Sequence, residues 1–216
     1  MNKNLFEAQY NVTKKSKLKL FYESNKVLIY SFIFVLIFSI AAFTYYVEDQ
    51  EKKRFLLSEN YVKAKILLSN GKNDEAFNLL KNIVVSNDDV YSSLALFMIL
   101  NQNLITDQKE ISSLFNNLLE KNKFNEEMRN LILYKKALYN SNYVSESILL
   151  DEIKPLLNKK ESVWRVHALL LLGEYFMSKN ENLKAKDFYI EILNTTDLPR
   201  DLYNQAQLKL SLVKND

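Results

Sequence analysis

The feature that most constrains this chain is an uncharged apolar run near its N-terminus. From Val27 to Val47 the sequence reads VLIYSFIFVLIFSIAAFTYYV, with no Asp, Glu, Lys or Arg in it. A helix needs about 20 such residues to cross a bilayer, so the run has the length of a membrane span. Tyr30, Tyr45 and Tyr46 lie near its two ends, where tyrosine rings prefer the membrane interface. The sequence therefore predicts one transmembrane helix over residues 27–47.

Two other interpretations of the run are a buried core helix and a cleavable signal peptide. A core helix normally carries a polar stripe, and this run has none. Ser39-Ile40-Ala41 loosely resembles a signal cleavage site, but a polar arm of 26 residues precedes a run that is long for a signal peptide. Both observations favour the span.

The charges on either side of the run indicate its direction. Next to the run on its N-terminal side, residues 14–26 carry one acidic residue, Glu23, against the basic residues Lys14, Lys15, Lys17, Lys19 and Lys26. Three basic residues, 52–54, follow the run, and they are balanced by Glu48, Asp49 and Glu51. Positive flanks stay inside, so we expect residues 1–26 to be a cytoplasmic arm and residues 48–216 to lie on the outer side of the membrane.

The rest of the chain is predicted to be all-α. It has few of the Gly and Pro residues that punctuate β-hairpins, since the whole sequence contains two of each. Helices are expected at Glu48 to Asn70, Asp74 to Val85 and Pro199 to Val213, with a left-handed cap at Gly71. Polar turns are expected at 86–89, 101–107, 121–125, 140–145, 158–162, 179–182 and 194–198.

Two predicted hairpins share an internal spacing. Ala64 precedes Ala76 by twelve residues, and Gly173 precedes Ala185 by the same number. Small residues let the two helices of a hairpin approach closely, while larger apolar residues fill the space between hairpins. This pattern predicts an α-solenoid of degenerate tetratricopeptide-like hairpins, with an irregular helical bundle as the alternative.

The order of these features resembles the bacterial tetratricopeptide-like family that includes the ancillary subunit of the SecYEG translocon. The resembling segments are Asn4-Leu5-Phe6-Glu7, Lys17 to Asn25, the span, Tyr61 to Ala64, Gly71-Lys72, Tyr91 to Ala95, and Trp164-Arg165 before Leu171-Leu172-Gly173. The resemblance implies a Gram-negative inner-membrane protein with a periplasmic domain. It also implies partners among translocon subunits, periplasmic chaperones and exported chains. The sequence departs from the repeat pattern between Asn101 and Lys160.

The sequence shows no pattern of catalytic, metal-binding or cofactor-binding residues. Cysteine is absent, and His167 is the single histidine. The adjacent carboxylates at Asp88-Asp89 and Glu126-Glu127 fit helix N-termini, where negative charge is favourable. A net charge of +3, with most basic residues interleaved with acidic ones, gives no nucleic-acid surface. We therefore expect neither an enzyme nor a small-molecule or cofactor site.

The function expected from these features is a docking surface. The first helix of each hairpin would line a concave groove for a partner polypeptide, formed by Tyr61, Lys65, Leu68, His167, Leu170 and Glu174. The alternative is a structural scaffold or oligomerising subunit of another cell-envelope complex. A hydrolase that uses paired carboxylates is a third hypothesis, for which no residue pair suggests a substrate.

Overall fold

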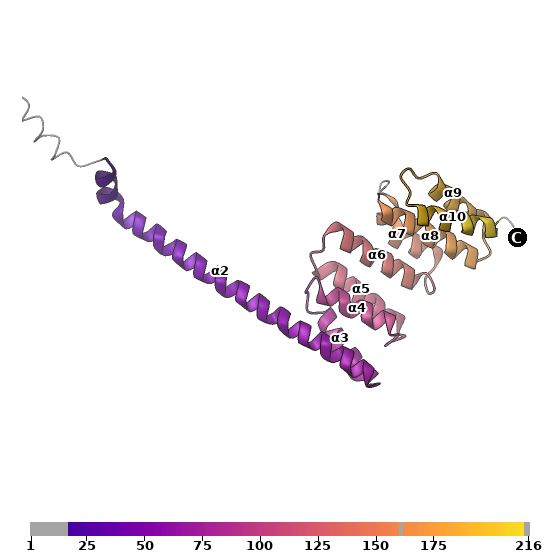
Figure 1. The fold of residues 1–216 in the computed structure, drawn as a ribbon, viewed down its shortest axis with the longest axis horizontal. Helices are drawn as coiled ribbons and strands as arrows, with labels where there is room; N and C mark the ends of the chain where they lie inside the picture. The colour runs from indigo at the N-terminus through magenta and orange to yellow at the C-terminus, as the bar shows by residue number, and fades with distance from the viewer. Residues whose placement is uncertain (1–16, 160–161, 214–216) are drawn as a thin grey trace, which may run out of the picture. The chain divides into compact units, whose positions relative to one another are not determined.

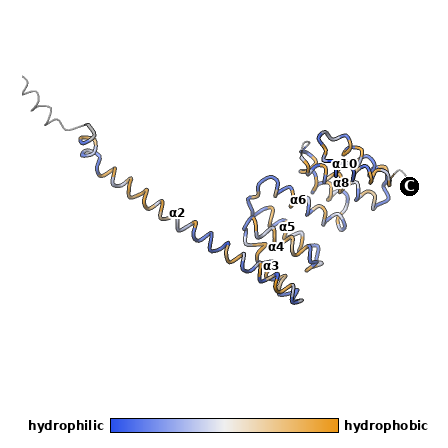
Figure 2. Tube along the Cα trace, viewed as in Figure 1, coloured by the Kyte–Doolittle hydropathy of each residue, from blue (hydrophilic) through white to orange (hydrophobic). Residues whose placement is uncertain are grey.

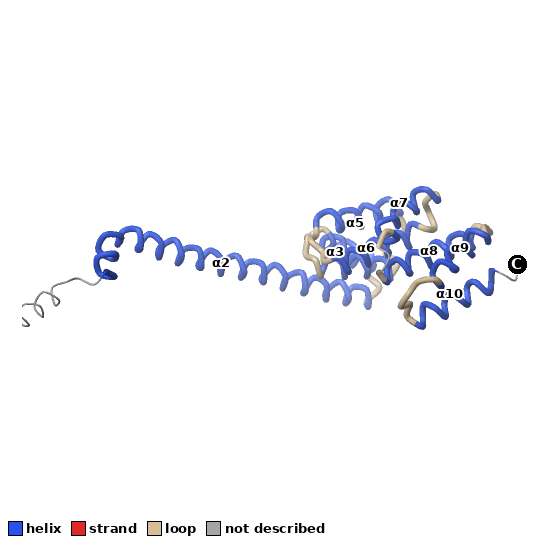
Figure 3. The backbone as a smooth tube through the Cα atoms, turned by 90° about the horizontal axis from the view of Figure 1, so that it is seen from above, coloured by secondary structure: helices blue, strands red, loops and turns tan. Residues whose placement is uncertain are grey.

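The computed structural model describes residues 17–159 and 162–213, and it describes side chains from Lys19 onward. Within these ranges the chain forms nine α-helices and no strand. Figure 3 shows the helices in blue. The all-α prediction is therefore confirmed for the described part of the chain. The chain divides into two compact units, 1–56 and 57–216. The resembling segment at residues 4–7, the charges of Lys14 and Lys15, and residues 160–161 of one predicted turn lie outside the described residues.

The first helix, α2 (Lys17–Ser69), is long and apolar enough to cross a membrane. Figure 2 shows its apolar run in orange. None of the most apolar stretch is buried by the part of the chain that the structure describes, and Phe34 is 70% exposed. This exposure contradicts the buried-core alternative, because a core helix is covered by its neighbours. The Ser39 hydroxyl donates to the carbonyl oxygen of Val35 and the Thr44 hydroxyl to that of Ala41. Both polar groups are thus satisfied within the helix, as a lipid environment requires.

The second unit begins with the last turns of α2, which end at a left-handed glycine. Gly71 has φ +72°. The backbone amide of Lys72 donates to the carbonyl oxygen of Leu67 at 2.9 Å, and the amide of Gly71 donates to the carbonyl oxygen of Leu68 at 3.0 Å. These two bonds are the Schellman pattern that closes a helix C-terminus. The predicted left-handed cap is confirmed, and α3 (Asn73–Val84) begins two residues later.

The same turn closes the other predicted hairpin. Between α8 (Val163–Ser178) and α9 (Asn182–Leu193), Asn180 has φ +60°. The amide of Glu181 donates to Phe176 at 2.9 Å and the amide of Asn180 donates to Met177 at 3.0 Å. Asn180 follows Gly173 by seven residues, as Gly71 follows Ala64. The matched spacing in the sequence therefore corresponds to matched backbone geometry in the two turns.

The remaining helices are separated by the predicted polar turns. They are α4 (Tyr91–Asn101), α5 (Gln108–Lys121), α6 (Glu126–Asn140), α7 (Glu146–Leu157) and α10 (Arg200–Val213). Side chains of Asp107, Asn125 and Ser162 accept backbone N–H bonds at the starts of α5, α6 and α8. The prediction that α10 begins at Pro199 was wrong by one residue. The Pro199 carbonyl accepts the Tyr203 amide at 3.0 Å, so Pro199 stands just before the first helical residue.

The second unit is held together by two apolar clusters. The N-terminal cluster runs from the end of α2 to α6 and contains Phe115 and Ile99 among its buried residues. The C-terminal cluster runs from α6 to α10 around Phe176 and Tyr189. Helix α6 belongs to both, because Ile132 is buried in the first cluster and Ala137 in the second. It is therefore the element that joins the two halves of this unit.

Helices that follow one another in the chain pack on one another, as the order of α3 to α10 in Figure 1 shows. Contacts also join alternate helices, namely α3 with α5, α6 with α8 and α8 with α10. Helices α4 and α6, by contrast, barely touch. The space left between them positions the site described next.

Candidate functional site

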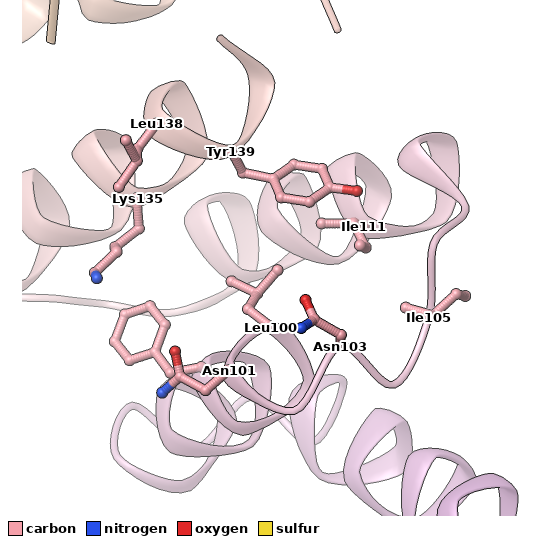
Figure 4. A pocket seen from close by; sticks show the side chains of 9 residues that line it. Leu100, Asn101, Asn103, Ile105, Ile111, Lys135, Leu138 and Tyr139 are labelled. Carbon is pink, nitrogen blue, oxygen red and sulfur yellow. The ribbon is translucent and has the colours of Figure 1, made fainter. Parts of the chain in front are cut away.

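A pocket of about 290 Å³ opens between the end of α4 and the second half of α6. Figure 4 shows it from close by. Its lining residues come from α4, the following turn, α5 and α6. They are Phe97, Leu100, Asn101, Asn103, Ile105, Ile111, Lys135, Leu138 and Tyr139. Six of the nine are apolar or aromatic, which is the usual composition of a binding pocket.

Polar groups on both walls of this pocket have no side-chain partner among the described residues. The side chains of Lys135, Asn101 and Asn103 form no ion pair or side-chain hydrogen bond with any residue of the described ranges. The neighbouring Lys136 differs, because its ammonium lies 3.0 Å from a carboxylate oxygen of Glu152. Lys135 is therefore a cation at the mouth of an apolar pocket with no carboxylate of this part of the chain to neutralise it.

The turn after α4 presents Asn103 to the pocket. Asn103 has φ +48°, and its amide donates to Leu100 at 3.2 Å while the amide of Leu104 donates to Ile99 at 3.1 Å. Asparagine tolerates this left-handed conformation better than most residues. The turn thus fixes Ile105 and Asn103 at the pocket wall.

The other end of the pocket is formed by Tyr139, which Figure 4 shows reaching towards Ile111. Burial raises the pKa of Tyr139, and Tyr143 and the negative charge of Asp107 raise it further. Asp107 is held in place because its Oδ1 accepts the amides of Lys109 and Glu110 at the start of α5. One end of the pocket therefore carries a positive charge and the other end lies in the field of a negative one.

A second feature is an aromatic cluster on α6 and α8. The ring of Tyr134 lies 6.1 Å from that of Trp164 and 5.6 Å from that of His167, centroid to centroid. Trp164 Nε1 donates to Glu127 at 2.6 Å. Burial lowers the pKa of His167, and the charge of Asp201 on α10 acts in the opposite direction. A half-buried imidazole packed against the rings of Tyr134 and Trp164 is a packing group that ties α8 to α6.

The predicted groove residues on α2 lie at the N-terminal cluster. Tyr61 and Leu68 are half-buried and pack against it, and the Tyr61 ring lies 6.1 Å from the Tyr91 ring. Lys65 is exposed. None of the three lines the pocket between α4 and α6.

The predicted groove residues on α8 lie in three different environments. Leu170 is 5% exposed inside the C-terminal cluster, so the prediction that it faces an open groove was wrong: it fills the core. His167 lies in the aromatic cluster, and Glu174 pairs with Lys209 of α10 at 2.7 Å. The structure therefore does not gather the six predicted residues into one site.

Sequence reasoning missed the pocket for a physical reason. Its residues come from four segments. The pocket lies between α4 and α6, which barely touch, and no local spacing in the sequence records their separation. The only sequence signal was the polar turn predicted over 101–107, which supplies Asn101, Asn103 and Ile105.

The paired carboxylates have structural partners. Asp88 Oδ1 accepts the amides of Val90 and Tyr91 at the start of α4. Glu126 and Glu127 stand in the first turn of α6, where their charge is favourable. In residues 17–159 and 162–213 no group of three His, Asp or Glu side chains is placed to hold a metal ion.

Comparison of the chain with protein-family models, with curated proteins and with solved structures gives no match.

Proposed function

We propose that this chain is a membrane-anchored protein–protein interaction module. The observation that carries the proposal is the exposed apolar run of α2, which no described part of the protein covers. An uncovered run of this length is unfavourable in water and favourable in lipid. The module is thus a helical domain held at a membrane surface.

The helical domain is proposed to be a degenerate tetratricopeptide-like solenoid. Its support is the pair of matched turns at Gly71 and Asn180, with Ala64 and Gly173 buried seven residues before them. The contacts between alternate helices also follow the order of a stack. Solenoids of this kind present extended surfaces to partner polypeptides, which is the reason to expect binding and not catalysis.

The partners are proposed to be subunits of the protein-export translocon, periplasmic chaperones or exported chains. The support is the sequence resemblance and the Lys-rich flank before the span. In this arrangement residues 1–26 are cytoplasmic, residues 27–47 span a bacterial inner membrane and residues 48–216 are periplasmic. Tethering to the membrane raises the effective concentration of the domain near a membrane partner, so weak contacts suffice.

Photocrosslinking in native membranes tests the proposal. The informative variant carries a photoreactive phenylalanine analogue in place of Leu138, a pocket residue that is 37% exposed. The matched control places it at Leu183 of α9, which is 80% exposed and lies outside the pocket. Translocon subunits, chaperones or exported chains captured from Leu138 and not from Leu183 would support the proposal. Capture of only the chain itself or of another envelope complex would favour the scaffold alternative.

A further inference from the structure

We propose that the pocket between α4 and α6 binds a segment of a partner polypeptide in which a large apolar side chain adjoins an Asp or Glu residue. The apolar side chain enters the pocket and the carboxylate pairs with Lys135. This inference rests on the proposed function, since it names the kind of peptide that the interaction module recognises.

The size of the pocket fits one or two side chains. At about 290 Å³ it stands at the lower limit for pockets that enclose a small-molecule ligand. Phe97, Leu100 and Ile105 are only half-buried, so an inserted apolar group would remove their remaining surface from water. A long lipid chain would exceed this space, whereas an aromatic or branched aliphatic side chain would not.

The charges give the bound segment a direction. Lys135 stands at the end of the pocket that Asn101 borders, and Tyr139 occupies the other end, as Figure 4 shows. The negative charge of Asp107 raises the pKa of Tyr139, so this charge is felt at the Tyr139 end of the pocket. A carboxylate of the bound segment would be repelled there. A carboxylate beside Lys135 would meet an ammonium that has no competing acidic partner in the described ranges. The acidic residue therefore belongs at the Lys135 end.

The two asparagine side chains favour a polypeptide over a fatty acid. Each amide offers two donors and an acceptor, and neither Asn101 nor Asn103 uses them within the described ranges. The backbone of an extended peptide supplies alternating donors and acceptors that match these groups. A fatty acid offers its carboxylate and nothing further to them.

Fluorescence anisotropy on the full-length chain in nanodiscs tests the inference. The probe is a short labelled peptide of Gly and Ser with a central Phe-Glu pair, acetylated and amidated at its ends. Control peptides replace Phe with Ala, replace Glu with Lys, or remove Glu and end in a free carboxylate after Phe. We expect the Phe-Glu peptide to bind most tightly, the Ala and Lys peptides least, and the free-carboxylate peptide to bind more weakly than Phe-Glu.

Charge reversal supplies a readout that a merely structural role would not move. A partly exposed ion pair is worth up to about fivefold in affinity, so Lys135→Glu, which replaces attraction by repulsion, should weaken Phe-Glu binding about tenfold. The same variant should strengthen binding of the Phe-Lys peptide. Lys186→Glu is the matched control, because Lys186 is also half-buried and without an ion pair in the described ranges but lies on α9. Lys186→Glu should leave the affinities for the Phe-Glu and Phe-Lys peptides unchanged. Lys135→Gln, which should weaken Phe-Glu binding less, provides a second variant if the reversal impairs folding.

The proposal is wrong if the Phe-Glu peptide fails to bind, if Lys135→Glu and Lys186→Glu weaken it equally, or if decanoate binds the pocket and the peptide does not. These failures differ from failure of the proposed function. Capture of translocon subunits, chaperones or exported chains from Leu138 and not from Leu183 would persist in that case, and only the recognition rule would be lost.

Discussion

Replacing Gly173 with Ala should reveal the close contact on which the α8–α9 hairpin depends. A Cβ atom at this position would lie 2.7 Å from Cζ and 3.0 Å from Cδ1 of Tyr189, closer than carbon atoms normally approach. Tyr189 is fully buried, and its hydroxyl donates to Met177 Sδ at 3.2 Å, so the ring has little freedom to move away.

Two effects of the added methyl group oppose each other. Overpacking a core costs about 1 to 3 kcal/mol. Alanine in place of glycine inside a helix contributes about 1 kcal/mol of stability. The first effect is larger, so the free energy of unfolding should fall by about 1 kcal/mol in the Gly173→Ala variant.

A double-mutant cycle separates these effects. With Tyr189→Leu the ring is gone, and Gly173→Ala should then stabilise the protein by up to about 1 kcal/mol, because only the helix preference remains. Tyr189→Phe is the matched control, since it keeps the ring and should keep the destabilisation. Urea unfolding of the detergent-solubilised chain, followed by the fluorescence of Trp164, the single tryptophan, measures all of these variants. An increase in stability from Gly173→Ala with Tyr189 intact would refute the close-packing argument.

Three further predictions concern single positions. Gly71→Ala should lower the free energy of unfolding by about 1 kcal/mol in urea, because the space around Gly71 is open and only its left-handed φ opposes a side chain, whereas Gly71→Asn should cost less. The His167 ring should titrate in NMR below the usual histidine pKa of about 6.5. As the pH falls through about 6.5, the unfolded chain takes up a proton at His167 before the folded chain does, so the free energy of unfolding should fall. His167→Gln should remove this pH dependence of stability. Titration of His167 at the usual histidine pKa would contradict the prediction. Glu152→Ala should cost about 2 kcal/mol in thermal or urea unfolding, because the mostly buried Lys136 ammonium and the Asn140 amide lose their shared acceptor; a change near zero would show that the network is dispensable.

The helices and turns were predictable because their signals are local. A glycine or asparagine seven residues after a small residue marks two helix ends, and the structure has Schellman turns at both. Asp107 and Asn125 likewise mark helix starts, because their side chains accept hydrogen bonds from backbone N–H groups two or three residues further on. The apolar run was recognisable for the same reason, since its character depends on composition alone.

The site was not predictable from the same signals. Leu170 and His167 have the spacing of a helix face, but periodicity alone does not tell which face is buried when neighbouring helices cover both sides of α8. The pocket depends on the separation of α4 and α6. Its positive charge depends on which of the two adjacent lysines, Lys135 or Lys136, forms an ion pair. Lys136 has Glu152 and Lys135 has none in the described ranges, a difference that adjacent positions in the sequence do not disclose.

Alkaline carbonate extraction of membranes that contain the full-length chain tests the central claim most directly. Residues 27–47 should hold the intact chain in the membrane pellet, and a variant with Val35→Arg and Ile37→Asp should move to the supernatant. Release of the unaltered chain by carbonate, or recovery of a product cleaved near Ala41, would contradict a membrane-anchored interaction module.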